Sequence, residues 1–197
     1  MNKEDNLKEK FKQALVSTIK VISDDYKLGN EINENSSSKN YNFFELDNLN
    51  IKQDYIKLRA ETDSEALKRK FSNLKIYQKN LPKNSLCRSL YDISEKIRYE
   101  NLGTKMLKGI SKNLTDNYSN KITLKRKDQL KSKDDVPVAE AFELYMLKKF
   151  MGIKLNPFSE KILGYWEKEF ETSFEKHINY LNKNIENQDI YSSKLSE

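Results

Sequence analysis

The chain of 197 residues is long enough for one domain with a buried core, and it carries a formal net charge of +6. Hydrophobic residues make up 37% and charged residues 34% of the sequence, a balance that excludes an intrinsically disordered chain. The single cysteine, Cys87, excludes an intrachain disulfide, and the lack of long apolar runs excludes a membrane-spanning helix.

The N-terminal part predicts one amphipathic helix followed by a turn-rich segment. Apolar residues recur every three or four positions over residues 5–28, and Gly29 is a natural stop. Residues 30–45 place a run of asparagine and serine between two short apolar stretches, which predicts either a small β-hairpin or an irregular loop. The first twelve residues contain no apolar stretch, so we expect no signal peptide and a reducing, cytoplasmic location.

The middle of the chain predicts three further helices. The second covers residues 51–80 and is ended by Pro82. The third begins at Ser85, a suitable N-cap, and Gly103 is expected to interrupt it before a fourth helix over residues 106–118.

A charged connector and two more helices follow. The connector, residues 121–135, leads into a fifth helix that starts at Pro137 and ends at Gly152. The sixth helix, residues 157–182, carries bulky apolar residues every four positions. Such a stripe winds around the helix, so it either packs against several neighbours in turn or offers an aromatic strip to another chain.

These elements predict a mostly α protein, an irregular bundle of about six helices with one small β-hairpin as an option near residues 30–45. We expect residues 1–182 to form the helical domain and residues 183–197 to form a polar tail or the start of a linker.

The positive charge comes almost entirely from lysine. Only five arginines are present, although arginine is the better reader of phosphate and of guanine edges. A solvated surface is therefore favoured over a nucleic-acid groove. A basic helical nucleic-acid-binding domain that uses lysines of residues 121–133 remains the alternative.

The sequence lacks the residues of the common catalytic and metal sites. His177 is the only histidine and Cys87 the only cysteine, so these residue types cannot supply a zinc site. No phosphate-binding loop of the G-x-x-x-x-G-K-[ST] type and no G-x-G-x-x-G motif is present. We therefore expect no catalytic, cofactor-binding or metal site on this chain.

The densest group of charged and small residues lies between residues 90 and 114. Glu95 and Arg98 are three positions apart, so they share a helix face and can pair, whereas Glu100 projects elsewhere. Gly103 lets the chain turn or approach a neighbour closely, and a tight helix crossing at Gly109 would explain a glycine there.

Two interpretations of this group remain open. One is a salt-bridged pair of helices, and the other is a contact surface for a partner subunit formed by Glu95, Arg98, Glu100 and Asn113. The second interpretation predicts that charge reversal at Arg98 weakens partner binding and leaves the helices intact.

This group is also similar to a segment of a known family. The shared pattern reads E-x-x-R-x-E-x-x-G and then G-x-x-x-N-L, and it matches Glu95, Arg98, Glu100, Gly103, Gly109, Asn113 and Leu114 without a gap. The family is CobT, a subunit of the aerobic, ATP-dependent cobaltochelatase. The start of the first helix and the fifth helix with its terminal glycine resemble the same family, so the resemblance covers most of residues 7–182.

The resemblance implies a part in cobalamin biosynthesis. Cobaltochelatase inserts Co²⁺ into hydrogenobyrinic acid a,c-diamide with ATP hydrolysis. Its AAA+ subunit CobS uses ATP and Mg²⁺, and its large subunit CobN holds the corrin. The chain resembles the N-terminal helical region of CobT, without the von Willebrand A-like domain that usually follows. It would serve as a non-catalytic assembly region in an oligomeric complex, with CobS as the expected partner and CobN as a second candidate, and without cofactor, membrane or nucleic acid.

Overall fold

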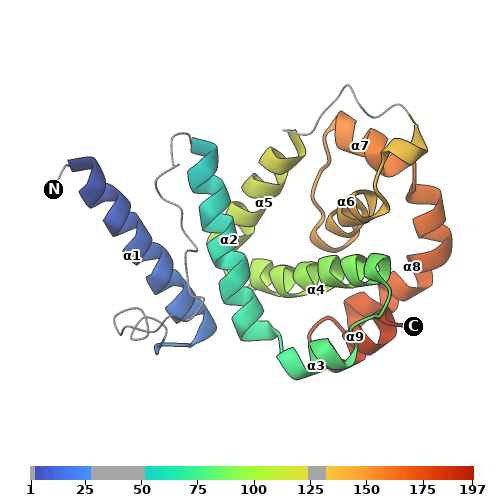
Figure 1. The fold of residues 1–197 in the computed structure, drawn as a ribbon, viewed down its shortest axis with the longest axis horizontal. Helices are drawn as coiled ribbons and strands as arrows, with labels where there is room; N and C mark the ends of the chain where they lie inside the picture. The colour runs from blue at the N-terminus through green and yellow to red at the C-terminus, as the bar shows by residue number, and fades with distance from the viewer. Residues whose placement is uncertain (1–2, 28–51, 124–131) are drawn as a thin grey trace.

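A computed structural model describes residues 3–27, 52–123 and 132–197 of the chain. These residues form nine α-helices and no strand, so the predicted mostly α class is confirmed (Figure 1). The helices are α1 (Lys3–Ser23), α2 (Lys52–Phe71), α3 (Leu74–Lys79), α4 (Ser85–Met106), α5 (Lys108–Thr123), α6 (Val138–Met151), α7 (Pro157–Gly164), α8 (Glu167–Lys183) and α9 (Gln188–Leu195). The hairpin predicted near residues 30–45 lies outside the described residues.

Two of the predicted helices are each divided in two. The predicted helix over residues 51–80 ends at Phe71 and restarts as α3, because Asn73 adopts an extended backbone and caps the new helix. Its side chain accepts hydrogen bonds from the backbone N–H groups of Lys75 and Ile76. The predicted helix over residues 157–182 is divided after Gly164 into α7 and α8.

Asparagine also caps α4, α7 and α9. The α4 cap is Asn84, whose side chain accepts from the backbone N–H groups of Leu86 and Cys87, so the prediction of Ser85 as the cap is wrong by one residue. At the C-terminal end of α6, Gly152 has a φ of 62°, and the helix ends there as predicted.

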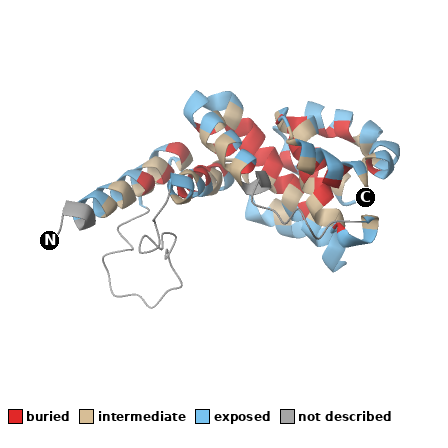
Figure 2. Cartoon of the chain, turned by 90° about the horizontal axis from the view of Figure 1, so that it is seen from above, coloured by how far each residue is buried: buried red, intermediate tan, exposed pale blue. Residues whose placement is uncertain are grey.

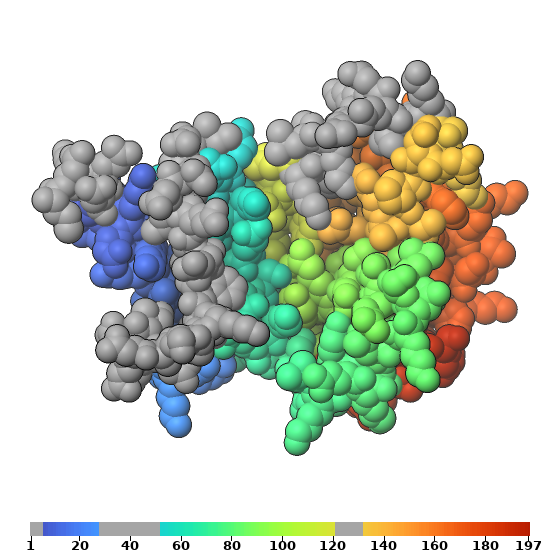
Figure 3. All heavy atoms as spheres, viewed as in Figure 1, coloured from blue at the N-terminus to red at the C-terminus, as the bar shows by residue number. Residues whose placement is uncertain are grey.

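α4 lies across the middle of the molecule. It packs against α2, α5, α6 and α9, whereas α1 lies at one edge and packs on α2 (Figure 1). Side chains of these helices fill the spaces between the ribbons (Figure 3). None of the described helices is both long and apolar enough to cross a membrane.

Two large apolar clusters hold the helices, and a third, small one joins Leu15 of α1 to Leu58 of α2. The larger surrounds α6 and reaches α4, α7, α8 and α9. In it Phe142 meets Phe170 edge to face, with ring centroids 5.6 Å apart, and Phe174 and Trp166 pack beside them. The stripe predicted for residues 157–182 is therefore used for core packing rather than offered to another chain.

The smaller cluster joins α1, α2, α4 and α5 through residues such as Ile19, Leu67 and Leu114. Most of α1 is exposed or half-buried, while buried residues gather nearer to the C-terminus (Figure 2). The first helix thus lies at the edge of the described structure (Figure 1).

Gly103 marks the closest packing within this smaller cluster. A Cβ atom built on Gly103 would lie 2.3 Å from Cδ1 of Leu67, so only glycine lets α2 approach α4 this closely. The helix continues past Gly103 to Met106, so the predicted interruption comes a turn later. The crossing predicted at Gly109 is wrong, because a Cβ there would meet nothing within 4 Å.

The C-terminal residues differ from the prediction. Residues 183–197 were expected to be a polar tail or the start of a linker, but they include α9, which packs against α3, α4 and α8. Tyr191 of this helix is fully buried.

Candidate functional site

Three charged side chains of α4 lie in the interior of the chain. Glu95 is 3%, Arg98 0% and Glu100 1% exposed. Charged groups are rarely buried this far unless they are paired, because losing their hydration costs several kcal/mol or more. These buried charges and the residues that pair with them are therefore the first candidate for a functional site in the described structure.

Arg98 ties α4 to the junction between α2 and α3. Its Nε donates to Oε2 of Glu95 at 3.3 Å, which confirms the predicted pairing within one helix face. Its Nη2 donates to the carbonyl oxygen of Phe71 at 2.8 Å and to Oγ of Ser72 at 3.2 Å. Phe71 is the last residue of α2, so the guanidinium also meets the negative end of that helix.

α9 completes the surroundings of Glu95. Ser192 donates its hydroxyl to Oε1 of Glu95 at 2.6 Å, and Gln188 donates Nε2 to Oε2 at 3.1 Å. The amide oxygen of Gln188 in turn accepts from the backbone N–H of Asn73 at 2.6 Å. The carboxylate is thus held by α4 and α9 together, and Gln188 links it to the start of α3.

Tyr191 seals the same region. Its hydroxyl donates to the carbonyl oxygen of Ser94 at 3.2 Å, and its ring centroid lies 5.9 Å from the guanidinium carbon of Arg98. Burial raises the pKa of the Tyr191 hydroxyl, and the nearby charge of Glu95 raises it further. Among the described residues, Ser94 Oγ and Arg98 Nη1 are the two buried side-chain atoms without a hydrogen-bond partner.

Glu100 belongs to a second network, between α4, α2 and α5. Ser64 and Tyr118 each donate a hydroxyl to its carboxylate at 2.6 Å, and the ammonium of Lys96 lies 3.9 Å away. Burial raises the pKa of Glu100, although these three partners each oppose the shift. Burial also raises the pKa of the Tyr118 hydroxyl well above its ordinary value, as does the charge of Glu100.

Asn113 lies in a third contact. Its amide donates from Nδ2 to Oδ2 of Asp63 at 2.8 Å and so joins α5 to α2. Burial raises the pKa of Asp63, while this hydrogen bond and the charge of Arg59 lower it.

The four residues predicted as a partner contact therefore all have partners within the chain. Glu95 and Arg98 share one network, whereas Glu100 and Asn113 each lie in another. A contact with a partner through these side chains stays a prediction. Because Arg98 is buried beside Glu95, we now expect charge reversal at Arg98 to destabilise the fold itself.

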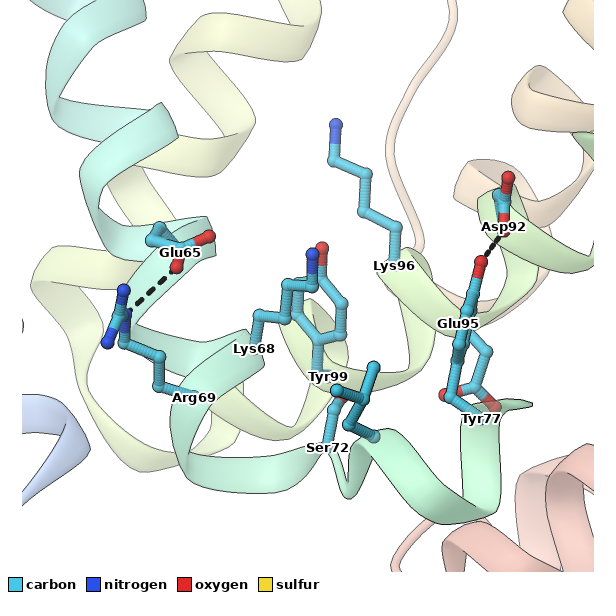
Figure 4. A pocket seen from close by; sticks show the side chains of 10 residues that line it. Glu65, Lys68, Arg69, Ser72, Tyr77, Asp92, Glu95, Lys96 and Tyr99 are labelled. Atoms are coloured by element: carbon cyan, nitrogen blue, oxygen red, sulfur yellow. Dashed lines mark hydrogen bonds and ion pairs between the residues drawn. The ribbon is translucent and has the colours of Figure 1, made fainter. Parts of the chain in front are cut away.

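A groove with several charged side chains in its lining opens beside these networks, between α2 and α4. It consists of a pocket of about 570 Å³, partly lined by α3, and a smaller one of about 300 Å³ that reaches α5. Glu65, Lys68, Lys96 and Tyr99 line both pockets, so the two pockets are neighbours. The side chain of Lys96 points away from α4 (Figure 4), and its ammonium group lies 5.5 Å from the centroid of the Tyr118 ring.

Sequence reasoning missed this groove. Lys68 and Lys96 are two lysines among many in the sequence, and only the packing of α2 against α4 brings them to one place. The one feature of the sequence that indicates an exposed surface here is the very polar character of residues 59–65 in the predicted second helix.

The described residues contain no group of three or more histidine, cysteine, aspartate or glutamate side chains arranged to hold a metal ion. Cys87 is exposed and His177 is half-buried on α8. These two side chains lie on different helices, α4 and α8.

Comparison with known proteins supplies one match. The family model described as "Cobalamin biosynthesis protein CobT" matches residues 5–197. The match includes both buried networks and the groove. No solved structure matches the chain.

Proposed function

This chain belongs to the CobT family of cobalamin biosynthesis proteins, and from that premise we propose that it is a non-catalytic assembly and regulatory region of a cobaltochelatase. In this role it supports the ATP-dependent insertion of Co²⁺ into hydrogenobyrinic acid a,c-diamide. The family match over residues 5–197 carries the proposal. ATP and Mg²⁺ would act on the AAA+ subunit of a cytoplasmic complex, and Co²⁺ is the substrate rather than a resident ion.

The buried charged residues, which link different helices of the chain, support an assembly role. Glu95, Arg98 and Glu100 each form at least one hydrogen bond to another helix of the same chain. Such interlocked networks fix the relative positions of α2, α4, α5 and α9, because a buried charge that loses its partner is costly. A body of fixed shape suits a protein that must present one surface to several subunits.

The expected partner is the AAA+ subunit, with the large corrin-binding subunit as a second candidate. Size-exclusion chromatography of this chain with the AAA+ subunit, with and without ATP, tests the proposal. We expect co-elution, and the same subunit run with an unrelated helical protein of similar size and pI is the control. Separate elution under both conditions would contradict the assembly role.

The alternative, a basic nucleic-acid-binding domain, has less support. Of the lysines in its proposed segment, Lys133 pairs with Glu169 and lies with its ammonium 4.2 Å from the centroid of the Trp166 ring. The alternative requires binding to nonspecific DNA that weakens steeply as salt is added.

A further inference from the structure

The α4–α5 corner, residues 105–109, carries exposed apolar and basic side chains where α4 meets α5. All five of its residues are exposed. Met106 is 38% and Leu107 is 49% exposed, and the two lie between Lys105 and Lys108 in the sequence. Single exposed apolar residues are common on protein surfaces, but here two adjacent ones lie beside two lysines and a glycine.

The backbone holds this corner in a defined shape. Leu107 has an extended backbone, with φ −140° and ψ 126°, so α4 ends there, and α5 leaves at an angle to α4 (Figure 1). The N–H of Leu107 donates to the carbonyl oxygen of Gly103 at 3.2 Å, and its own carbonyl oxygen accepts from the N–H of Ser111 at 3.2 Å. The corner is therefore ordered before a partner binds, which lowers the entropy lost on binding.

Neither the backbone conformation nor the packing within the chain requires a glycine at position 109. Gly109 lies in the first turn of α5, and glycine is less favourable than alanine inside a helix. Gly152 is the one described glycine with a positive φ. A Cβ atom built on Gly109 would meet nothing within 4 Å. A glycine on an open helix surface lets a second backbone approach closely, so this position suits a helix from another molecule.

The corner also carries positive charge that the described chain does not neutralise. Residues 101–115 contain three lysines and no aspartate or glutamate. Lys112 pairs with Asp116, whereas Lys105 and Lys108 form no hydrogen bond or ion pair with a described residue. Lys108 begins α5, and the positive end of this helix has no acidic residue in its first turn. A carboxylate from outside the chain would neutralise this charge.

The glycine, the apolar pair and the charge together favour a helix of another protein over other occupants. A membrane surface or a nucleic acid would match the positive charge, but neither requires a glycine. A second copy of this chain in a symmetric dimer would place Lys105 and Lys108 against the same patch of the other copy. Such an arrangement is unfavourable because like charges repel.

We propose that the α4–α5 corner binds a helix of a partner protein on which an apolar residue is flanked by carboxylates. The backbone of that helix lies close to Gly109, and its apolar side chain packs on Met106 and Leu107. Its carboxylates pair with Lys105 and Lys108. That the partner is a subunit of the chelatase rests on the assembly role proposed above, but binding of such a helix can be tested without it.

The first test is fluorescence anisotropy of a labelled helical peptide with the full chain at low ionic strength. The peptide has about four turns, with leucine and alanine on one face and glutamate beside them. A peptide of the same composition in scrambled order is its control. Gly109→Ala adds one methyl group at an open position and favours the helix. We expect this variant to bind the amphipathic peptide about tenfold more weakly, because the methyl group holds the two backbones apart.

Gly164→Ala is the matched control variant. Gly164 is also exposed, and a Cβ atom there would also meet nothing within 4 Å, but it lies at the end of α7. We expect at most about a twofold change in peptide binding for this variant. The thermal unfolding midpoint of the Gly109→Ala chain should equal or exceed that of the unaltered chain, so weaker binding cannot come from a damaged fold.

The lysines of the corner are tested in the same assay. Lys105→Ala with Lys108→Ala should weaken binding about fivefold. The control is Lys75→Ala with Lys83→Ala, which removes two other exposed lysines that form no ion pair with a described residue. We expect at most about a twofold change for the control.

Absence of binding to the unaltered chain, equal binding of the scrambled peptide, or equal effects of Gly109→Ala and Gly164→Ala would overturn the proposal. So would equal effects of the two double lysine variants. Sedimentation with vesicles of phosphatidylcholine and phosphatidylglycerol that the Lys105 and Lys108 variant abolishes and Gly109→Ala leaves intact would overturn it in favour of a membrane surface. A dimer in analytical ultracentrifugation that Gly109→Ala dissociates would overturn it in favour of a second copy.

Co-elution with the AAA+ subunit is measured separately. Failure of co-elution while the peptide still binds in a Gly109-dependent way removes the assembly role alone. Co-elution without Gly109-dependent peptide binding removes the corner proposal alone.

Discussion

Arg98 connects three parts of the chain through one side chain. It contacts Glu95 within α4, the carbonyl of Phe71 at the end of α2, and the ring of Tyr191 in α9. Replacing it by an apolar residue of similar length would leave the carboxylate of Glu95 buried without its cation.

We therefore predict that Arg98→Met lowers the free energy of unfolding by about 3 kcal/mol, because breaking a buried pair from one side leaves an uncompensated charge. Urea denaturation followed by circular dichroism measures this. Arg88→Met on the same helix is the control, because Arg88 is exposed, and it should change stability by less than about 0.5 kcal/mol. A similar small effect at Arg98 would contradict the structural role.

Glu100 gives a prediction about pH. Because burial raises its pKa above the ordinary value of 4.5, the native carboxyl keeps its proton at pH values where the unfolded one has lost it. The native state then binds more protons, so this group makes the protein less stable as pH rises from about 4.5 through the raised pKa.

Glu100→Gln removes that dependence. The free energy of unfolding of the variant, relative to the unaltered chain, should rise as pH increases from about 4.5, as measured by urea denaturation in a pH series. Glu61→Gln, at an exposed position on α2, controls for the loss of one negative charge. A relative stability that does not change with pH would show that burial of Glu100 does not shift its titration.

Of the contacts made by the buried charged residues, the sequence predicted the pairing of Glu95 with Arg98 and did not predict those with distant residues. The pairing of Glu95 with Arg98 follows from a spacing of three within one helix. Ser192 lies 97 positions from Glu95, and nothing in either local sequence indicates that they meet. Long-range partners of a buried charge are set by packing, which a local pattern does not encode.

Gly103 of α4 and Gly109 of α5 differ in how closely neighbouring side chains pack against them, so alanine substitutions at the two positions should have opposite effects on stability. Gly103→Ala should cost about 1–3 kcal/mol, because its methyl group must displace Leu67 from a closely packed position. Gly109→Ala should instead add about 0.5 kcal/mol, because its methyl group meets nothing and alanine favours the helix. Thermal or urea denaturation of both variants checks the difference, and equal effects would mean that the two helices can separate without cost.

The apolar stripes predicted where helices lie, although they did not predict the divisions at Asn73 and after Gly164. The sequence predicts a tail in place of α9, because the buried face of α9 includes Gln188 and Ser192 beside Tyr191, rather than a run of apolar residues. The division at Asn73 was missed because apolar residues continue on both sides of it, although asparagine is a strong N-cap. In both cases polar side chains decided the structure.

The whole molecule has a well-packed side and a peripheral one. α1 packs mainly on α2 through the smaller cluster, whereas α6 is surrounded by the larger cluster. Elements with fewer buried contacts open at lower free energy. We therefore predict that backbone amides of α1 exchange with deuterium faster than those of α4 and α6 under native conditions.

Native-state hydrogen exchange followed by mass spectrometry measures this, with the amides of α5 as an internal comparison, because α5 also packs on α2. Protection of α1 equal to that of α6 would mean that the molecule opens as one cooperative unit.

The position of α9 along the chain also affects how the protein is made. The carboxylate of Glu95 receives the hydroxyl of Ser192 only after the 97 positions between them have been synthesised, which at about 5–20 residues per second takes roughly 5–20 s. Until then the ribosome has produced a central helix in which buried Glu95 lacks the two hydrogen-bond donors of α9. The nascent chain therefore has to keep α4 hydrated, or shielded by a chaperone, until α9 emerges.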